Sequence, residues 1–116
     1  MITRHRQTSH LHGAVIHNGV VYASGHAAKD LTKDIRGQTQ EICDKLDALL
    51  ADCGSDKTKL LSARIYLTDM ADKAGMNEVW TTWLAAADLP ARATIGGADL
   101  GDPQRRVEIV VIAAQG

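Results

Sequence analysis

The sequence predicts an α+β domain, residues 1–116, in which a mixed β-sheet carries two helices on one face. Three observations point to this class. Strand-like runs outnumber helical ones, hairpin-like pairs of runs stand at both ends of the chain, and only two segments have helical periodicity. Apolar residues make up 45% of the chain, which is enough for the core of one domain, and the absence of Phe leaves aliphatic side chains to fill it.

The first half of the chain is predicted to form three strands and a helix. Residues 2–6 form a short strand, and residues 13–25 contain two strands joined at Asn18-Gly19, a dipeptide favoured in two-residue hairpin turns. A polar loop follows. Residues 38–52 then place apolar side chains at i, i+1, i+4, i+7 and i+8, so they predict a helix with one buried stripe.

The second half is predicted to form a strand, a helix and two more strands. Residues 61–68 alternate between two faces. One face is apolar (Leu61, Ala63, Ile65 and Leu67), and the other is polar but expected to be covered (Ser62, Arg64, Tyr66 and Thr68). A helix over residues 71–86 and strands over 91–97 and 107–114 complete the order β-β-β-α-β-α-β-β.

The last strand is apolar on both sides apart from Glu108, so both faces of the sheet should be buried. Two helices cover only one face, and the sequence offers no third layer. We therefore expect the second face to pack against other copies of the chain in a closed oligomer. A monomer with loops folded over the sheet is the alternative, which the short loops disfavour.

Arg92 and Glu108 each interrupt an apolar strand. If these strands form an antiparallel hairpin centred near Leu100, the two charges lie directly opposite each other, with Cβ atoms about 5 Å apart. One interpretation is a structural ion pair, in which each charge lowers the other's cost of burial. The other is a binding site for a small carboxylate. Thr94 points the same way as Arg92, and the two glycines that follow leave room for a ligand beside the guanidinium.

Four segments resemble the reactive intermediate deaminase family, called Rid or YjgF: NGVVYASG, ARIYLTDMADKAGMNEVW, PARATIGGADL and VEIVVIAA. The resemblance extends from about Ala14 to Ala114. It implies a chorismate-mutase-like fold and a homotrimer, in which the sheets form an inner barrel and clefts between subunits hold a small-molecule ligand.

The resemblance also implies a reaction, the hydrolysis of enamines and imines such as 2-aminoacrylate to 2-keto acids and ammonia, without a cofactor or a metal. Arg92 matches the arginine that holds the substrate carboxylate, and Glu108 matches the glutamate that positions water. Further residues match positions that line the cleft: Ser24, Gly25, Asn77 and Thr94.

Two departures from the family pattern concern the site. The segment SHLHGA lacks a tyrosine found in well-described members, so His12 is a candidate to take its place and His26 a second one. The turn between Arg92 and Glu108 is a residue longer than in those members, which would move Glu108 if the turn set its position.

Composition limits the remaining function classes. A net charge of −1 disfavours a nucleic-acid partner, and no apolar run reaches the roughly 18–20 residues that span a bilayer. The first twenty residues contain no signal segment, so we expect a cytoplasmic protein. Cys43 and Cys53 would be about 15 Å apart on one helix, too far for a disulfide.

Three alternatives remain open at this point. His10 and His12 share a strand face, but no carboxylate or cysteine nearby completes a metal site, so we expect no metal. A non-catalytic trimer that binds a keto acid, or a chaperone-like binder, would have the same cleft. Ribonuclease activity, attributed to some relatives, is the least favoured because the sequence has no basic stripe.

Overall fold

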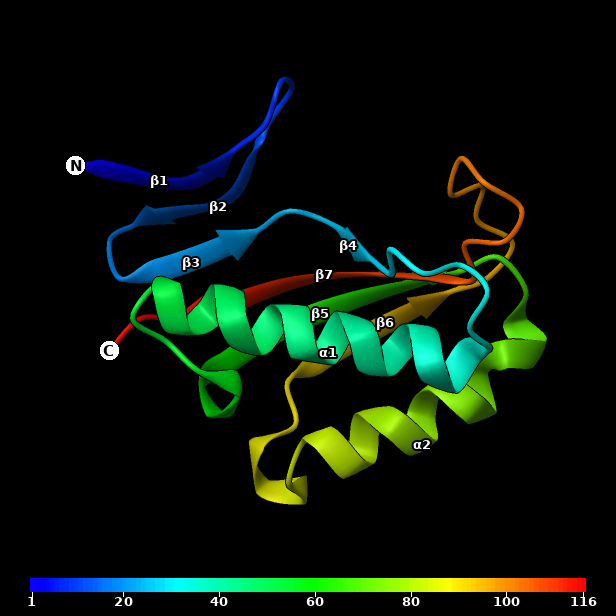
Figure 1. Cartoon of the computed structure of the whole chain (residues 1–116). Helices are drawn as coiled ribbons and strands as arrows, with labels where there is room; N and C mark the ends of the chain where they lie inside the picture. The colour runs from blue at the N-terminus through cyan, green and yellow to red at the C-terminus, as the bar shows by residue number, and fades with distance from the viewer.

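Two helices, α1 (Ile35–Asp52) and α2 (Lys73–Trp83), cover one face of a seven-stranded mixed sheet in the computed structural model of residues 1–116 (Figure 1). The strands are β1 (Ile2–Gln7), β2 (His12–His17), β3 (Val20–Ala23), β4 (His26–Ala27), β5 (Leu60–Leu67), β6 (Ala91–Ile95) and β7 (Val107–Ala114). Their order is β1-β2-β3-β7-β5-β6, and β4 pairs with β7 beyond the end of β3. The predicted fold class, with both helices on one face, is confirmed.

The predicted hairpin at Asn18-Gly19 joins β2 to β3. Both turn residues have positive φ, 50° and 74°, as a two-residue type I′ turn requires. The register places His17 opposite Val20 and Ala14 opposite Ala23. In Figure 1 the β1–β2 pair extends away from the helical layer, and only β2 pairs with β1.

Helix α1 begins earlier than its hydrophobic periodicity predicts. Asp34 is the N-cap, and its carboxylate accepts a 2.8 Å hydrogen bond from the backbone N–H of Gly37. Gly54, with φ 72°, stands just beyond the other end. The buried stripe consists of Ile35, Gln38, Thr39, Ile42, Cys43, Leu46, Leu49 and Leu50. Cys43 and Cys53 are both buried and free, as predicted.

The predicted antiparallel hairpin of the last two strands is wrong. Strand β6 pairs in parallel with β5, and β7 pairs antiparallel with the other edge of β5, so β5 separates the two strands. The cause is the connection through α2, because a strand–helix–strand crossover returns to the same sheet in parallel. Segment 96–106 then carries the chain past β5 to β7.

Strand β5 contains a second difference from the prediction. An irregularity in pairing between Leu60 and Ser62 turns Leu61 outward, where half of it is exposed, and buries Leu60 instead. From Ala63 onward the predicted alternation holds. Ala63, Ile65 and Leu67 are buried, while Arg64 on the other side is exposed.

The sheet face opposite the helices is left partly open in one chain. On β7 the residues toward the helices are fully buried, whereas Val110, Ile112 and Ala114 on the other side are only partly buried. Tyr22 and Ile95 lie on this open face and remain 47% and 39% exposed. The chain therefore has an apolar face that its own helices do not cover.

Candidate functional site

Arg92 and Glu108 lie on opposite faces of the sheet. Arg92 on β6 pairs with Ala63 of β5, whose side chain is 1% exposed and packs toward the helices. Glu108 on β7 pairs with Tyr66 of β5, on the open face. Paired residues of neighbouring strands share a face, and successive residues alternate. The arrangement predicted from a hairpin, with both charges side by side in one chain, is therefore wrong.

The Arg92 side contains an arginine held against an aromatic ring. The guanidinium carbon of Arg92 lies 5.9 Å from the centroid of the Trp80 ring of α2, within cation–π range. Burial lowers the pKa of Arg92 from its ordinary value, and the side chain stays charged at neutral pH. Thr94 is two residues along the same strand and shares this face. Together, β6 and α2 place an exposed cation, in contact with an aromatic ring, at the edge of the sheet.

Asn77 belongs to the same region. It precedes Trp80 by one helical turn, so the two side chains lie on the same side of α2. Its side-chain oxygen Oδ1 is buried without a hydrogen-bond partner in the chain. An unpaired buried acceptor is costly, so the hydrogen-bonding capacity of this oxygen is unused within the chain. We call Arg92, Thr94 and Asn77 the arginine half-site.

The Glu108 side places a carboxylate against open backbone. A Cβ atom built on Gly25 would lie 2.6 Å from Glu108 Oε2, closer than any side chain tolerates. Gly25 thus lets the carboxylate approach the chain between β3 and β4. Glu108 lies between Ala27 of β4 and Tyr66 of β5 in the sheet. We call Ser24, Gly25, Tyr66 and Glu108 the glutamate half-site.

Backbone contacts hold the turn around Ser24. The Ser24 N–H and hydroxyl both donate to the carbonyl of Gly13, at 2.9 Å and 3.2 Å. His26 Nδ1 lies 2.8 Å from the carbonyl of Ser24 and donates to it, and burial lowers the pKa of His26. His26 pairs with Ile109, whose side chain is on the helix side. His26 therefore supports the turn from the face opposite Glu108.

A buried glutamine anchors the start of β7. Gln38 of α1 is 0% exposed, and its amide N–H groups donate to the carbonyls of Lys33 and Gln104 at 3.0 Å and 2.9 Å. Its side-chain oxygen accepts from the N–H of Arg106 at 3.0 Å. Arg106 precedes Glu108 by two residues, so Gln38 fixes the backbone from which the carboxylate extends.

His12 lies apart from both half-sites. It pairs with Gln7, and strand alternation places it on the face of Ala14, which is buried toward the helices. It lines a depression of about 240 Å³ at the tip of the β1–β2 hairpin. His10 lies in the turn rather than on a shared strand face, contrary to the sequence-based expectation. The chain contains no cluster of three or more potential metal ligands.

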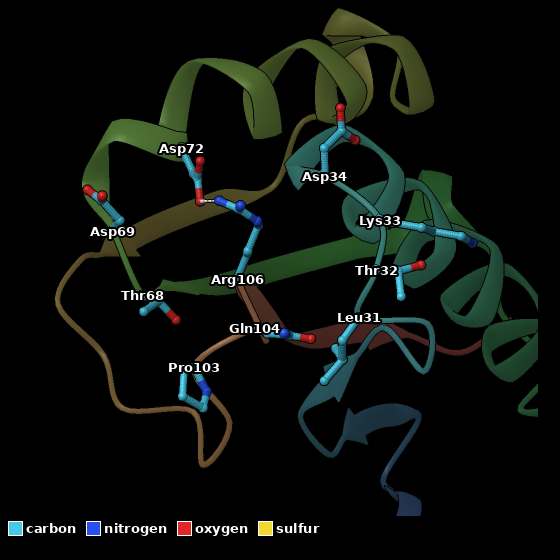
Figure 2. Close-up of a pocket in the computed structure, with 10 residues that line it drawn as sticks. All are labelled: Leu31, Thr32, Lys33, Asp34, Thr68, Asp69, Asp72, Pro103, Gln104 and Arg106. Atoms are coloured by element: carbon cyan, nitrogen blue, oxygen red, sulfur yellow. Dashed lines mark hydrogen bonds and ion pairs between the residues drawn. The ribbon is translucent and has the colours of Figure 1, made fainter.

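A separate pocket of about 670 Å³ is lined almost entirely by polar residues (Figure 2). Figure 2 shows Arg106 reaching toward Asp72, with an Nη1–Oδ2 distance of 3.3 Å. The lining residues are Leu31, Thr32, Lys33, Asp34, Thr68, Asp69, Asp72, Pro103, Gln104 and Arg106. The lining carries both positive and negative side chains, and it includes neither Arg92 nor Glu108.

Neither helix is long and apolar enough to cross a membrane.

Tyr66 and Trp80 are contacts that the sequence did not single out for the site. Tyr66 is the direct cross-strand neighbour of Glu108, and Trp80 is the ring under Arg92. The alternation of residues 61–68 did place Tyr66 on the second face of its strand. The alternation could not identify Glu108 as the neighbour of Tyr66, because alternation does not show which strands are adjacent.

Comparisons with known proteins agree with this fold along the whole chain. Residues 2–115 match the family model described as endoribonuclease L-PSP. A RutC family protein of Haemophilus ducreyi is 40% identical over 114 residues, covering 98% of this chain and 97% of that protein. The RutC family protein YoaB of Escherichia coli is 39% identical over 100 residues, covering 86% of each.

Solved structures show the same architecture. A member of the YjgF protein family from Neisseria meningitidis has a TM-score of 0.96 and 40% sequence identity, covering all of this chain and 96% of that one. A protein of unknown function of the Rid family from Yersinia pestis has a TM-score of 0.84 and 29% identity, covering 93% and 90%. The model match and these relatives show that the chain belongs to the endoribonuclease L-PSP family, which includes the YjgF and Rid proteins.

Proposed function

We propose that the protein hydrolyses small carboxylate-bearing imines and enamines to 2-keto acids and ammonia, at a site built by two copies of the chain. The observation that carries this proposal is the placement of Arg92 and Glu108 on opposite faces of one sheet. One chain cannot offer both to one ligand. A second copy that covers the open face can bring its arginine half-site to the glutamate half-site.

The open face supports such an assembly. It is apolar and partly exposed, and members of this family typically bind small molecules and form oligomers. A closed homotrimer gives every glutamate half-site one neighbouring arginine half-site. Each subunit then contributes its glutamate half-site to one contact and its arginine half-site to another, so that every half-site has a partner.

The chemistry needs few groups. Arg92 holds the substrate carboxylate through its guanidinium fork, and Asn77 and Thr94 offer polar atoms beside it. A protonated imine is already electrophilic, so Glu108 of the other copy need only orient a water molecule and accept its proton. An enamine first takes a proton at carbon to become the imine. The water oxygen bonds to the imine carbon as Glu108 takes a proton from the water, which gives a carbinolamine. Glu108 then returns this proton to the amine nitrogen, the carbinolamine hydroxyl loses its proton as the carbonyl forms, and the carbon–nitrogen bond breaks to release ammonia. No electrons are exchanged with another reactant.

Subunit mixing tests the proposal. Arg92→Ala and Glu108→Gln should each reduce imine hydrolysis by about 10–100-fold when they form the whole oligomer. Imines generated by an amino acid oxidase and trapped by semicarbazide provide the assay. When the two variants are mixed and allowed to exchange subunits, random assembly should restore roughly a quarter of the wild-type rate, because that share of contacts joins two intact half-sites.

The control is each variant mixed with itself and processed in the same way. Native mass spectrometry on subunits of different mass shows whether exchange has occurred. If exchange is complete and no activity returns, the site is not shared between copies.

Some members of this family are not catalytic, and the same half-sites suit a keto-acid-binding protein. Calorimetric titration with 2-oxobutyrate separates the two functions. Arg92-dependent binding by a protein that does not accelerate imine hydrolysis would select the binding function.

A further inference from the structure

The open face of the sheet contains a second arginine that the proposed function does not use. Among the residues of β3, β5, β6 and β7 on this face, only Arg64 and Glu108 are charged. Arg64 is exposed and has no ion-pair partner within the chain. An exposed, unpaired guanidinium in the middle of an otherwise largely apolar face therefore needs a physical account.

The register places Arg64 close to the glutamate half-site. Arg64 lies between Val110 of β7 and Ala93 of β6, and Tyr66, two residues along, is the partner of Glu108. Arg64 and Glu108 are therefore diagonal neighbours across β5 and β7, about 7–8 Å apart between Cα atoms. Long side chains can meet at that separation, but no ion pair joins Arg64 to Glu108 within the chain, and the span also fits a small ligand.

The space beside Arg64 is open. A depression of about 220 Å³ lies over β5 and β6, lined by Ser62, Ala63, Arg64, Ala91, Arg92 and Ala93. The alanines next to Arg64 leave room for the long side chain to move, and the lining contains no carboxylate. The local charge is therefore positive, which favours an anionic group.

A second copy that covers this face would bury Arg64 together with Glu108. A guanidinium removed from water without a counter-charge is strongly unfavourable, whereas one that binds a carboxylate is satisfied in a bidentate geometry. Glu108 is the only carboxylate that the strands supply on this face, and in the proposed function it binds the attacking water molecule. A carboxylate of the ligand is then an anion that would satisfy Arg64 in the assembled site.

We propose that Arg64 binds a second, distal carboxylate of the substrate, so that the preferred substrates are imines of dicarboxylic amino acids. The inference rests on the proposed function, in which Arg92 of another copy holds the carboxylate next to the imine carbon. The substrate would then lie between two arginines with its reacting carbon near Glu108. Hydrolysis follows the same balance as above, and the distal carboxylate takes no part in bond breaking.

The first test compares imines with and without a distal carboxylate. Imines of glutamate and of norvaline, formed in situ by amino acid oxidases, differ mainly in the distal charge. The wild-type protein should prefer the glutamate imine by about 10–100-fold in kcat/KM, and Arg64→Gln should reduce that ratio by a similar factor. Arg4→Gln, on the same face but on the outer strand β1, is the matched control and should keep both the ratio and the rates.

The second test measures binding without turnover. The wild-type protein should bind 2-oxoglutarate about 10–100-fold more tightly than 2-oxobutyrate, and Arg64→Gln should remove that preference. A wild-type ratio near one, or a ratio unchanged by Arg64→Gln, overturns the inference whether or not imines are hydrolysed. Preferential binding that depends on Arg64, in a protein with no hydrolytic activity, would instead overturn the proposed reaction and leave the assigned ligand class intact.

Discussion

Gly25 and Glu108 lie so close together that a single added methyl group at Gly25 would displace the carboxylate. The Cβ position at Gly25 is 2.6 Å from Oε2 and 2.9 Å from the carboxyl carbon of Glu108. The backbone of Gly25 does not have a positive φ, so the absence of a side chain serves the close approach rather than the chain conformation.

Gly25→Ala should therefore disable Glu108 without unfolding the protein. We expect a loss of about 10²-fold in imine hydrolysis, because a shift of this size misplaces the reacting groups. Thermal unfolding should change little. In a Glu108→Ala background, Gly25→Ala should reduce imine hydrolysis no further. If Gly25→Ala reduces the rate as much there as in the wild-type protein, Gly25 does not act through Glu108.

Gln38→Ala should lower stability far more than a similar change nearby. The substitution leaves the carbonyl of Gln104 and the N–H of Arg106 without their partner inside the protein. We expect a decrease of about 2–4 kcal/mol in the free energy of unfolding, measured with urea. Gln40→Ala on the exposed side of α1 is the control and should cost about 0.5 kcal/mol or less. Equal effects would contradict the anchoring role.

Glu41 should make stability depend on acid pH. The backbone N–H of Lys29 donates to its carboxylate, and Lys33 lies 3.1 Å from it; these contacts lower the pKa of Glu41 from 4.5 to about 2. A carboxyl with a depressed pKa in the folded state stabilises fully above its unfolded pKa. That contribution is lost as pH falls from about 4.5 toward about 2. The difference in free energy of unfolding between wild type and Glu41→Gln should therefore shrink over this pH range. A difference that does not change with pH would contradict the proposed contribution of Glu41.

Neither cysteine should react in the native protein. Burial raises the pKa of Cys43 to about 12, and it also raises the pKa of Cys53. The thiolate is the reactive form, so both thiols should resist a disulfide reagent at pH 8. Two thiols per chain should titrate after denaturation. Rapid labelling of either one in the folded state would show that the α1 end of the core opens.

Hydrophobic periodicity predicted the two helices and strands β2, β3, β5 and β7 because each of these buries a single stripe or face. The Asn18-Gly19 turn and the buried stripe of α1 follow from local chemistry, and both are present. The start of α1 was misplaced because periodicity ignores capping. Asp34, whose side chain accepts from the N–H of Gly37, was the available signal.

The candidate site was harder to predict because it depends on which strands are neighbours. The alternation of β6 and β7 identifies Arg92 and Glu108 as exceptions, but it is silent on what lies between them. The crossover rule applied to β5, α2 and β6 would have required parallel strands. It would then have excluded a hairpin and separated the two charges. The contact of Arg92 with Trp80 depends on tertiary packing and has no local signal.

Segment 96–106 joins β6 to β7, and its middle, between Asp99 and Pro103, sets the position of neither strand. Each takes its register from β5, and the entry to β7 is fixed independently by Gln38 and by the N–H of Thr68, which donates to the carbonyl of Arg106. Residues added or removed between Asp99 and Pro103, away from these contacts, should therefore leave Glu108 in place. The length of this loop can thus change during evolution while the geometry of the candidate site stays constant.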